Sequence, residues 1–154
     1  MANVTYGNGD DVSPHELADF YDRVSHKIEA ETQRIEAMLN KSLAFVSARL
    51  DGKLVGIARG LSDGIRGYFT ECKLAPSLQG PAAVTKTDGR IEHDELGIAA
   101  EMAKRVLEKL QGSGVRRIDV LAYGTEMDFL EALGFKKTGG LVGMTMRMNS
   151  GNAD

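Results

Sequence analysis

The chain has 154 residues, with 19 Lys and Arg against 22 Asp and Glu, one cysteine and a formal net charge of −3. This length fits a single domain, and the acidic balance argues against a nucleic-acid binder, which needs a basic face. No apolar stretch approaches the ~18 residues of a membrane helix, and a lone cysteine gives neither an internal disulfide nor a thiolate metal site. We therefore expect one cytoplasmic domain over residues 1–148, a disordered tail over 149–154, and no metal, nucleic-acid or membrane partner.

The N-terminal third is expected to be helical after a short strand over residues 2–7. Ser13 can cap a helix, Pro14 suits its first turn, and Glu16 closes a capping box. Apolar residues recur at helical spacing from residue 17 to residue 39. The pattern predicts one long helix over 15–40, or two helices with a bend near Thr32.

The middle of the chain has the pattern of antiparallel strands. Residues 43–50 and 53–60 flank Asp51-Gly52, the two-residue signal for a type I′ hairpin, and residues 65–75 form a third expected strand. The following segment, 76–94, contains two prolines and two glycines and has little apolar periodicity. Long irregular segments within a compact domain are usually functional.

The C-terminal part alternates between helices and strands. An amphipathic helix is expected up to Gly112, then a strand over 115–122 and a short helix over 125–133 with Thr125 as its cap. Alternating apolar residues predict a final strand with a buried methionine face; they are Val142, Met144, Met146 and Met148. The element order indicates a mixed α/β fold.

Four segments together resemble the GNAT superfamily of acyl-CoA-dependent N-acetyltransferases; they are residues 52–59, 62–76, 97–99 and 129–135. The resemblance implies a central, mixed but mostly antiparallel sheet flanked by about four helices, with strands splayed at the cofactor cleft. It also implies acetyl-CoA as acyl donor and direct attack by a primary amine of a small molecule or peptide. A homodimer, paired through the C-terminal strand, is an additional option.

The resemblance also assigns the donor-binding groups. The main chain of Lys73, Leu74 and Ala75 would pair with the pantetheine arm. The helix start at Gly97, Ile98 and Ala99 would hold the pyrophosphate, because it offers unpaired N–H groups and a partial positive charge. Tight packing of this helix on the sheet is the alternative explanation of its small residues.

The phosphate loop departs from the family pattern. Asp94 stands where the family has Gln or Arg, and its alternative role is an ordinary helix cap. Gln79 and Gly80 are interpreted as the start of the loop, with 81–93 inserted behind them. Lys86 and Arg90 of this insert would then cover the phosphates.

The chemistry requires a base, because the pKa of an alkylammonium is about 10. Glu71 is the best candidate, and a cross-strand pair with Arg or Lys is its alternative role. Leu130 occupies the position of the family's usual acid, a tyrosine, so Tyr123 is the nearest replacement unless it only packs at a strand end. Phe129 would supply an apolar wall. The competing overall interpretation is a GNAT-fold binding or regulatory module that has lost catalysis.

Overall fold

The computed structural model of the chain describes residues 3–24, 32–80 and 89–148. Its five strands are β1 (Val4–Gly7), β2 (Ala44–Leu50), β3 (Lys53–Ser62), β4 (Gly67–Leu74) and β5 (Ile118–Val120). Its four helices are α1 (Pro14–Val24), α2 (Thr32–Lys41), α3 (Ile98–Gly112) and α4 (Met127–Ala132). The strands follow chain order in one sheet, and all neighbours are antiparallel except β4 and β5, which run parallel. The predicted mixed α/β fold, with a mostly antiparallel sheet and about four helices, is confirmed for the described residues.

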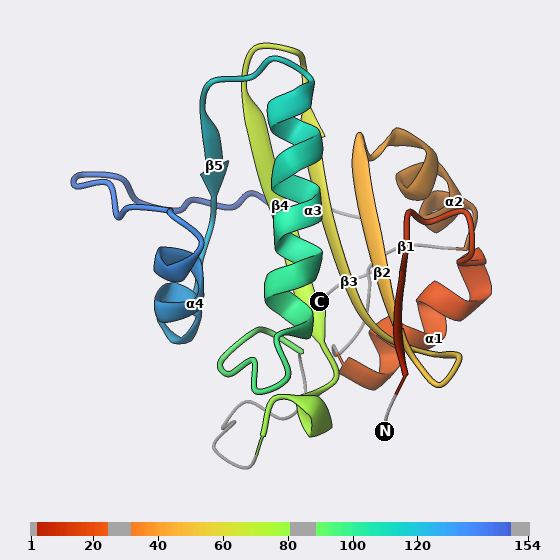
Figure 1. Cartoon of the computed structure of the whole chain (residues 1–154). Helices are drawn as coiled ribbons and strands as arrows, with labels where there is room; N and C mark the ends of the chain where they lie inside the picture. Colours follow the sequence, from red (N-terminus) through yellow and green to blue (C-terminus); the bar gives the residue numbers. More distant parts are fainter. Residues whose placement is uncertain (1–2, 25–31, 81–88, 149–154) are drawn as a thin grey trace.

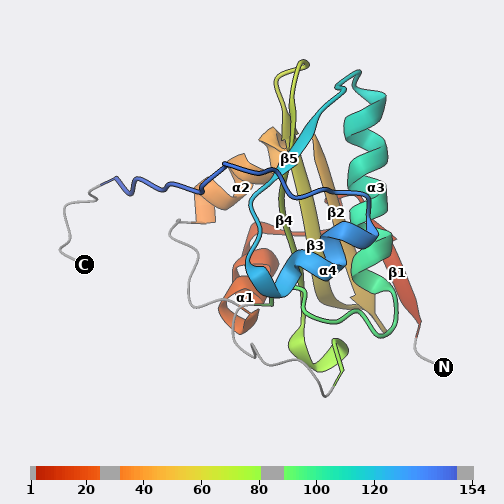
Figure 2. The same ribbon diagram turned by 90° about the vertical axis from the view of Figure 1, so that its left-hand side faces the viewer.

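The sheet is covered by helices on both faces (Figures 1 and 2). The long helix α3 packs on one face through a fully buried stripe that includes Met102, Val106 and Leu110. On the other face α1 and α2 bury Phe20 and Ile35 against side chains of β2 and β3. Side chains of β2 and β3 therefore enter two separate cores, one on each face of the sheet, as the period-2 pattern requires.

The β2–β3 hairpin forms as predicted. Asp51 and Gly52 have φ angles of 51° and 87°, the left-handed conformation that both central residues of a type I′ turn adopt. Gly52 is suited to this conformation, because it lacks the Cβ that makes left-handed backbone costly for other residues.

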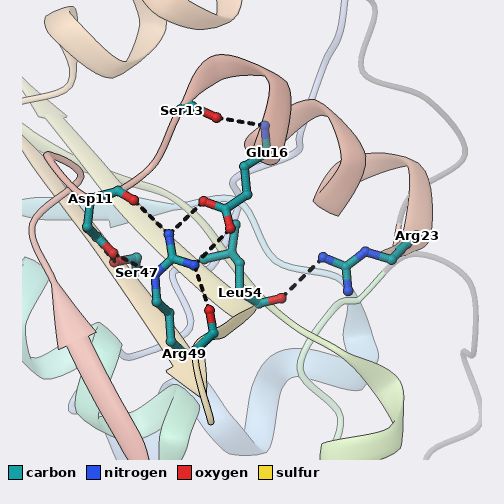
Figure 3. A network of polar contacts seen from close by, with 8 residues as sticks. Asp11, Ser13, Glu16, Arg23, Ser47, Arg49 and Leu54 are labelled. Carbon is teal, nitrogen blue, oxygen red and sulfur yellow. Dashed lines mark hydrogen bonds and ion pairs between the residues drawn. The ribbon is translucent and has the colours of Figure 1, made fainter.

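An ion-pair network fixes the start of α1 to the sheet (Figure 3). The guanidinium of Arg49 on β2 reaches both carboxylate oxygens of Glu16 at 2.6 and 2.8 Å, and Asp11 at 2.9 Å. Ser13 accepts the Glu16 N–H at 3.1 Å, so this half of the predicted capping box is confirmed. The network holds α1 in place along the sheet, and α1 carries Tyr21 to the site described below.

The structure corrects the expected elements at two places. Residues 142–148 form no strand, and the methionines expected in a buried face are exposed, Met144 at 89%. A strand requires a hydrogen-bonded neighbour, and among the described residues this segment forms no ladder with any strand of the sheet. Tyr123, rather than Thr125, caps the 3₁₀ turn that precedes α4. The bend expected near Thr32 falls beside residues 25–31, which lie outside the described residues, as does the expected tail over 149–154.

Candidate active site

The strands β4 and β5 diverge and leave a cavity between them. They pair only over three residues each, Gly67–Phe69 with Ile118–Val120, after which β4 continues to Leu74 without β5 beside it. A cavity of about 230 Å³ opens in this gap. Its wall brings together several residues that the sequence singled out, among them Glu71, Lys73, Tyr123 and Phe129.

Glu71 is held by two partners from different elements. The Tyr21 hydroxyl on α1 donates a hydrogen bond to Oε1, and Arg59 Nη2 on β3 lies 3.2 Å from Oε2. Arg59 and Glu71 face each other in register across β3 and β4, which confirms the cross-strand ion pair. Burial and the Glu71 charge raise the pKa of Tyr21 far above its ordinary value, so the phenol stays protonated. Glu71 is therefore an oriented carboxylate at the cavity wall.

Tyr123 stacks against a cation of the insert. The guanidinium carbon of Arg90 lies 3.5 Å from the centre of the Tyr123 ring, a close cation–π contact. Arg90 thus lies against the ring in the cavity wall, while Lys86, the other cation expected over the phosphates, lies outside the described residues. Tyr123 is 60% exposed, so its alternative role as a half-buried packing residue does not describe it well.

Glu126 is a site residue that sequence reasoning missed. Its Oε1 accepts the Tyr123 N–H at 3.1 Å, and its carboxylate also lines the cavity. Burial raises the pKa of Glu126 above its ordinary value, although the N–H groups of Tyr123 and Ile91 act in the opposite direction. Its position three residues after Tyr123 is a capping-box spacing, but tyrosine is not a usual cap, so the pattern gave little signal.

Asp94 occupies the start of α3. Its Oδ1 accepts the Ala99 N–H at 2.9 Å and its Oδ2 accepts the Ala100 N–H at 2.8 Å. Asp94 therefore satisfies N–H groups of the first helical turn, as its alternative role requires, although Gly97 and not Asp94 occupies the N-cap position. Gly97 adopts φ 73° and its Cβ position faces open space, while Ile98 and Ala99 are buried in the core. Tight packing therefore explains Ile98 and Ala99 but not Gly97, whose backbone conformation is the reason for a glycine.

The part of β4 that does not pair with β5 is bonded to other segments of the chain. The Leu74 N–H donates to the Gly89 carbonyl at 2.9 Å, and Lys73 forms an antiparallel bridge with Arg90. The Ala75 N–H donates to the Val55 carbonyl of β3 at 2.8 Å. The main-chain groups that the resemblance assigns to the pantetheine arm are present, but the N–H groups of Leu74 and Ala75 bond within the protein.

Gln79 and Gly80 contact residues 92–95, which lie just before the helix start that the resemblance pairs them with. The buried Gln79 amide donates to the Leu74 and Arg90 carbonyls at 3.0 and 2.9 Å, and its oxygen accepts the Glu92 N–H at 2.9 Å. Gly80 lines a second, open pocket of about 600 Å³ together with Glu95. Gln79 thus fixes the end of the insert to β4, and a direct contact of either residue with a cofactor stays a prediction.

To use the start of α3 and the edge of β4 in this conformation, acetyl-CoA would have to displace protein groups that already bond to them. The α3 N–H groups and the β4 edge have the right chemistry for a pyrophosphate and an amide-bearing arm. Both are engaged by residues 89–94.

Cys72 is buried, and burial raises the pKa of its thiol well above the ordinary value, as expected of a core residue rather than a nucleophile.

Among the described residues, no cluster of three or more His, Cys, Asp or Glu side chains could hold a metal ion. No helix in the described part of the chain is long and apolar enough to cross a membrane.

No family model and no curated protein matches the sequence. The structure, in contrast, is similar over nearly its whole length to solved acetyltransferases. A GNAT-family acetyltransferase from Streptococcus pneumoniae TIGR4 is 18% identical with a TM-score of 0.64, covering 97% of this chain and 99% of that chain. The aminoglycoside N-acetyltransferase AAC(6′)-Iy, solved with CoA, is 13% identical with a TM-score of 0.67, covering 96% and 97%. An aminoglycoside acetyltransferase from an uncultured soil metagenomic sample, in complex with sisomicin, is 12% identical with a TM-score of 0.66, again covering 96% and 97%. At these identities the likeness establishes the GNAT fold of this chain.

Proposed function

We propose that the protein transfers an acetyl group from acetyl-CoA to a primary amine. The observation that carries the proposal is the cavity between the diverging strands β4 and β5, with an oriented carboxylate and a tyrosine in its wall. Similar folds that bind CoA or an aminoglycoside support it. Acetyl-CoA, when bound, would supply the activated acetyl group.

Glu71 takes the role of general base. An amine attacks only as the neutral species, and at neutral pH it is mostly protonated, so a carboxylate at the cavity wall must accept a proton. The Tyr21 hydroxyl and the Arg59 guanidinium fix this carboxylate from two sides. A fixed acceptor adds no reorientation cost when the amine arrives.

Tyr123 takes the role of general acid. Its phenol belongs to an exposed side chain in the same cavity wall, and phenols can donate a proton to a departing thiolate. Leu130, in the position where the family usually has its tyrosine, is buried and has no proton to give. After the attack the amine nitrogen loses its second proton to solvent, which also restores the proton to Tyr123 and removes the one that Glu71 has accepted.

The acceptor is proposed to be a primary amine of a small molecule or peptide. Two carboxylates, Glu71 and Glu126, line the cavity and can attract a cation, although Lys73 and Arg90 partly offset them. We also propose a cytoplasmic location, since the single buried cysteine needs no oxidising compartment.

A homodimer is part of the same proposal. The extended segment 141–148 exposes alternating apolar side chains, and Leu121 beyond β5 is exposed next to it. Contiguous exposed apolar surface of this kind marks an interaction site. Among the described strands β5 pairs only with β4, so its other edge can receive segment 141–148 of a second copy.

Sedimentation velocity tests the dimer. Met144→Lys is expected to give monomers, whereas Ile65→Lys, at an equally exposed apolar residue of the β3–β4 turn, is expected to leave the dimer intact. If the wild-type protein is still monomeric at about 100 µM, its dimer dissociation constant is higher than that of ordinary stable dimers, and the pairing is contradicted.

A GNAT-fold module without catalysis is the second candidate. The observation that favours it is the engagement of both donor-binding elements by the chain's own residues 89–94. Incubation with acetyl-CoA and a panel of primary amines, followed by mass spectrometry, separates the two candidates. Acetylated product that disappears in Glu71→Gln supports the enzyme; no product from any amine, with folded protein and bound CoA, supports the module.

A further inference from the structure

Residues 89–94, called here the 89–94 segment, run from the end of β4 to the start of α3 and bond to both. At the strand end, the Gly89 carbonyl accepts the Leu74 N–H at 2.9 Å, and Arg90 bridges to Lys73 as an antiparallel partner. An extended amide-bearing ligand that adds to a strand edge uses the same groups. While Gly89 is in place, the Leu74 N–H is not available to such a ligand.

At the helix end, Asp94 performs the task of an anion. Both carboxylate oxygens are used, one on the Ala99 N–H and one on the Ala100 N–H, at 2.9 and 2.8 Å. A helix start favours negative charge because its N–H groups are unpaired and its dipole is positive there. A phosphate and this carboxylate cannot use the same N–H groups, and their charges repel each other.

The 89–94 segment is firmly fixed between its two ends. Ile91 is fully buried in the core on the α3 side of the sheet. The buried Gln79 amide binds the Arg90 carbonyl and the Glu92 N–H, both at 2.9 Å. Gly89 lies so close to α1 that a Cβ there would approach Val24 to 2.8 Å. These contacts are those of a packed element rather than of a surface loop.

We propose that the 89–94 segment is an internal competitor of the acyl donor. Its backbone at Gly89 and Arg90 lies where the donor's amide-bearing arm would add to β4, and the Asp94 carboxylate lies where a phosphate would meet α3. The inference rests on the proposed function and concerns access to the same site. Donor and segment exclude each other, so only molecules in which the segment has left can bind the donor. The smaller this fraction is, the weaker the measured affinity for the donor.

The test replaces Asp94 and measures binding by calorimetry, with coenzyme A and inorganic pyrophosphate as probes. Asp94→Ala frees both helix N–H groups and removes a charge, so both probes are expected to bind at least about 10-fold more tightly than to wild type. Asp94→Asn keeps one acceptor oxygen and is expected to fall between. Glu95→Ala is the matched control, because it removes a neighbouring carboxylate for which no hydrogen bond to α3 is seen among the described residues, and it is expected to tighten binding far less than Asp94→Ala. Melting temperatures confirm that each variant is folded.

Hydrogen exchange on the wild-type protein provides a second readout. Saturating coenzyme A is expected to increase deuterium uptake in peptides covering 89–94, because the segment must release its bonds. An ordinary lid that closes over a ligand would instead be protected.

The outcomes separate the inference from the proposed function. Asp94→Ala that is folded but binds both probes no more tightly than wild type and Glu95→Ala overturns the inference, as does protection of 89–94 by coenzyme A. Tighter binding by Asp94→Ala with no acetylation of any amine leaves the inference standing and refutes the proposed function. If the wild type acetylates an amine rapidly and Asp94→Ala binds the probes no more tightly, the proposed function stands and the inference is refuted.

Discussion

Glu71→Gln is the substitution that best tests the chemistry, because glutamine keeps the volume and an acceptor oxygen for Tyr21 but loses the charge. If Glu71 is the general base, turnover is expected to fall about 10²–10⁴-fold, or about 3–5.5 kcal/mol in barrier. The loss is expected to shrink as pH rises, since more of the amine is then already neutral.

The same change also weakens the Glu71–Arg59 pair, whose side chains are only 19% and 15% exposed. A hydrogen bond to a charged group contributes about 1.5–3 kcal/mol, and 1 kcal/mol shifts the melting temperature of a chain of this size by about 2–4 °C. The melting temperature is therefore expected to fall by about 3–12 °C. Loss of stability alone does not identify a base.

The double variant Glu71→Gln with Arg59→Met separates the two roles. Removing the unpaired guanidinium is expected to restore much of the stability, because no charge is left without its partner. Turnover is expected to stay low if Glu71 is the base. We would measure melting temperature and a pH–rate profile with the best amine of the panel. If folded Glu71→Gln turns over within about threefold of wild type at every pH, Glu71 is not the general base, because general-base effects are far larger than threefold.

Three further substitutions probe the fold and the site. Arg49→Met is expected to lower stability by about 1–2 kcal/mol at neutral pH through the lost pairs with Asp11 and Glu16. Burial raises the pKa of Asp11, but the hydrogen bonds from Arg49 and Ser47 outweigh burial, so the pKa of Asp11 in the folded protein lies below its ordinary value. The hydrogen bond from Arg49 likewise lowers the pKa of Glu16. The stabilisation is therefore present above the ordinary carboxyl pKa and lost as pH falls through the folded values, so melting curves of Arg49→Met and wild type should converge in acid; a constant gap contradicts this. Gly97→Val is expected to cost about 1–2 kcal/mol because φ is 73° there, whereas Gly97→Asn, which tolerates this conformation, should melt near wild type; equal losses would point to packing instead. Tyr123→Phe keeps the ring beneath Arg90, so its melting temperature is expected to be unchanged while turnover falls about 10²-fold or more; unchanged turnover removes Tyr123 as the acid.

The sequence by itself determined the elements whose signals are local. Asp51-Gly52 predicts its hairpin because only a few residue types adopt left-handed backbone twice in succession. The α3 stripe recurs at helical spacing, and the structure buries it as expected. The order of these elements was enough to indicate the fold, since each element buries one face and few arrangements satisfy all of them.

The tertiary structure decided which side chains meet. Tyr21 and Glu71 are 50 positions apart, and their contact depends on how α1 lies on the sheet, which no local pattern specifies. Arg59 faces Glu71 because of strand register, which a shift of one residue would change. Segment 142–148 has the alternation of a strand yet forms none, because alternation records which face is apolar and not whether a partner is present. Residues 89–94 carry little periodicity, and their place between β4 and α3 follows from the hydrogen bonds of β4, Gln79 and α3, which form only when the chain is folded.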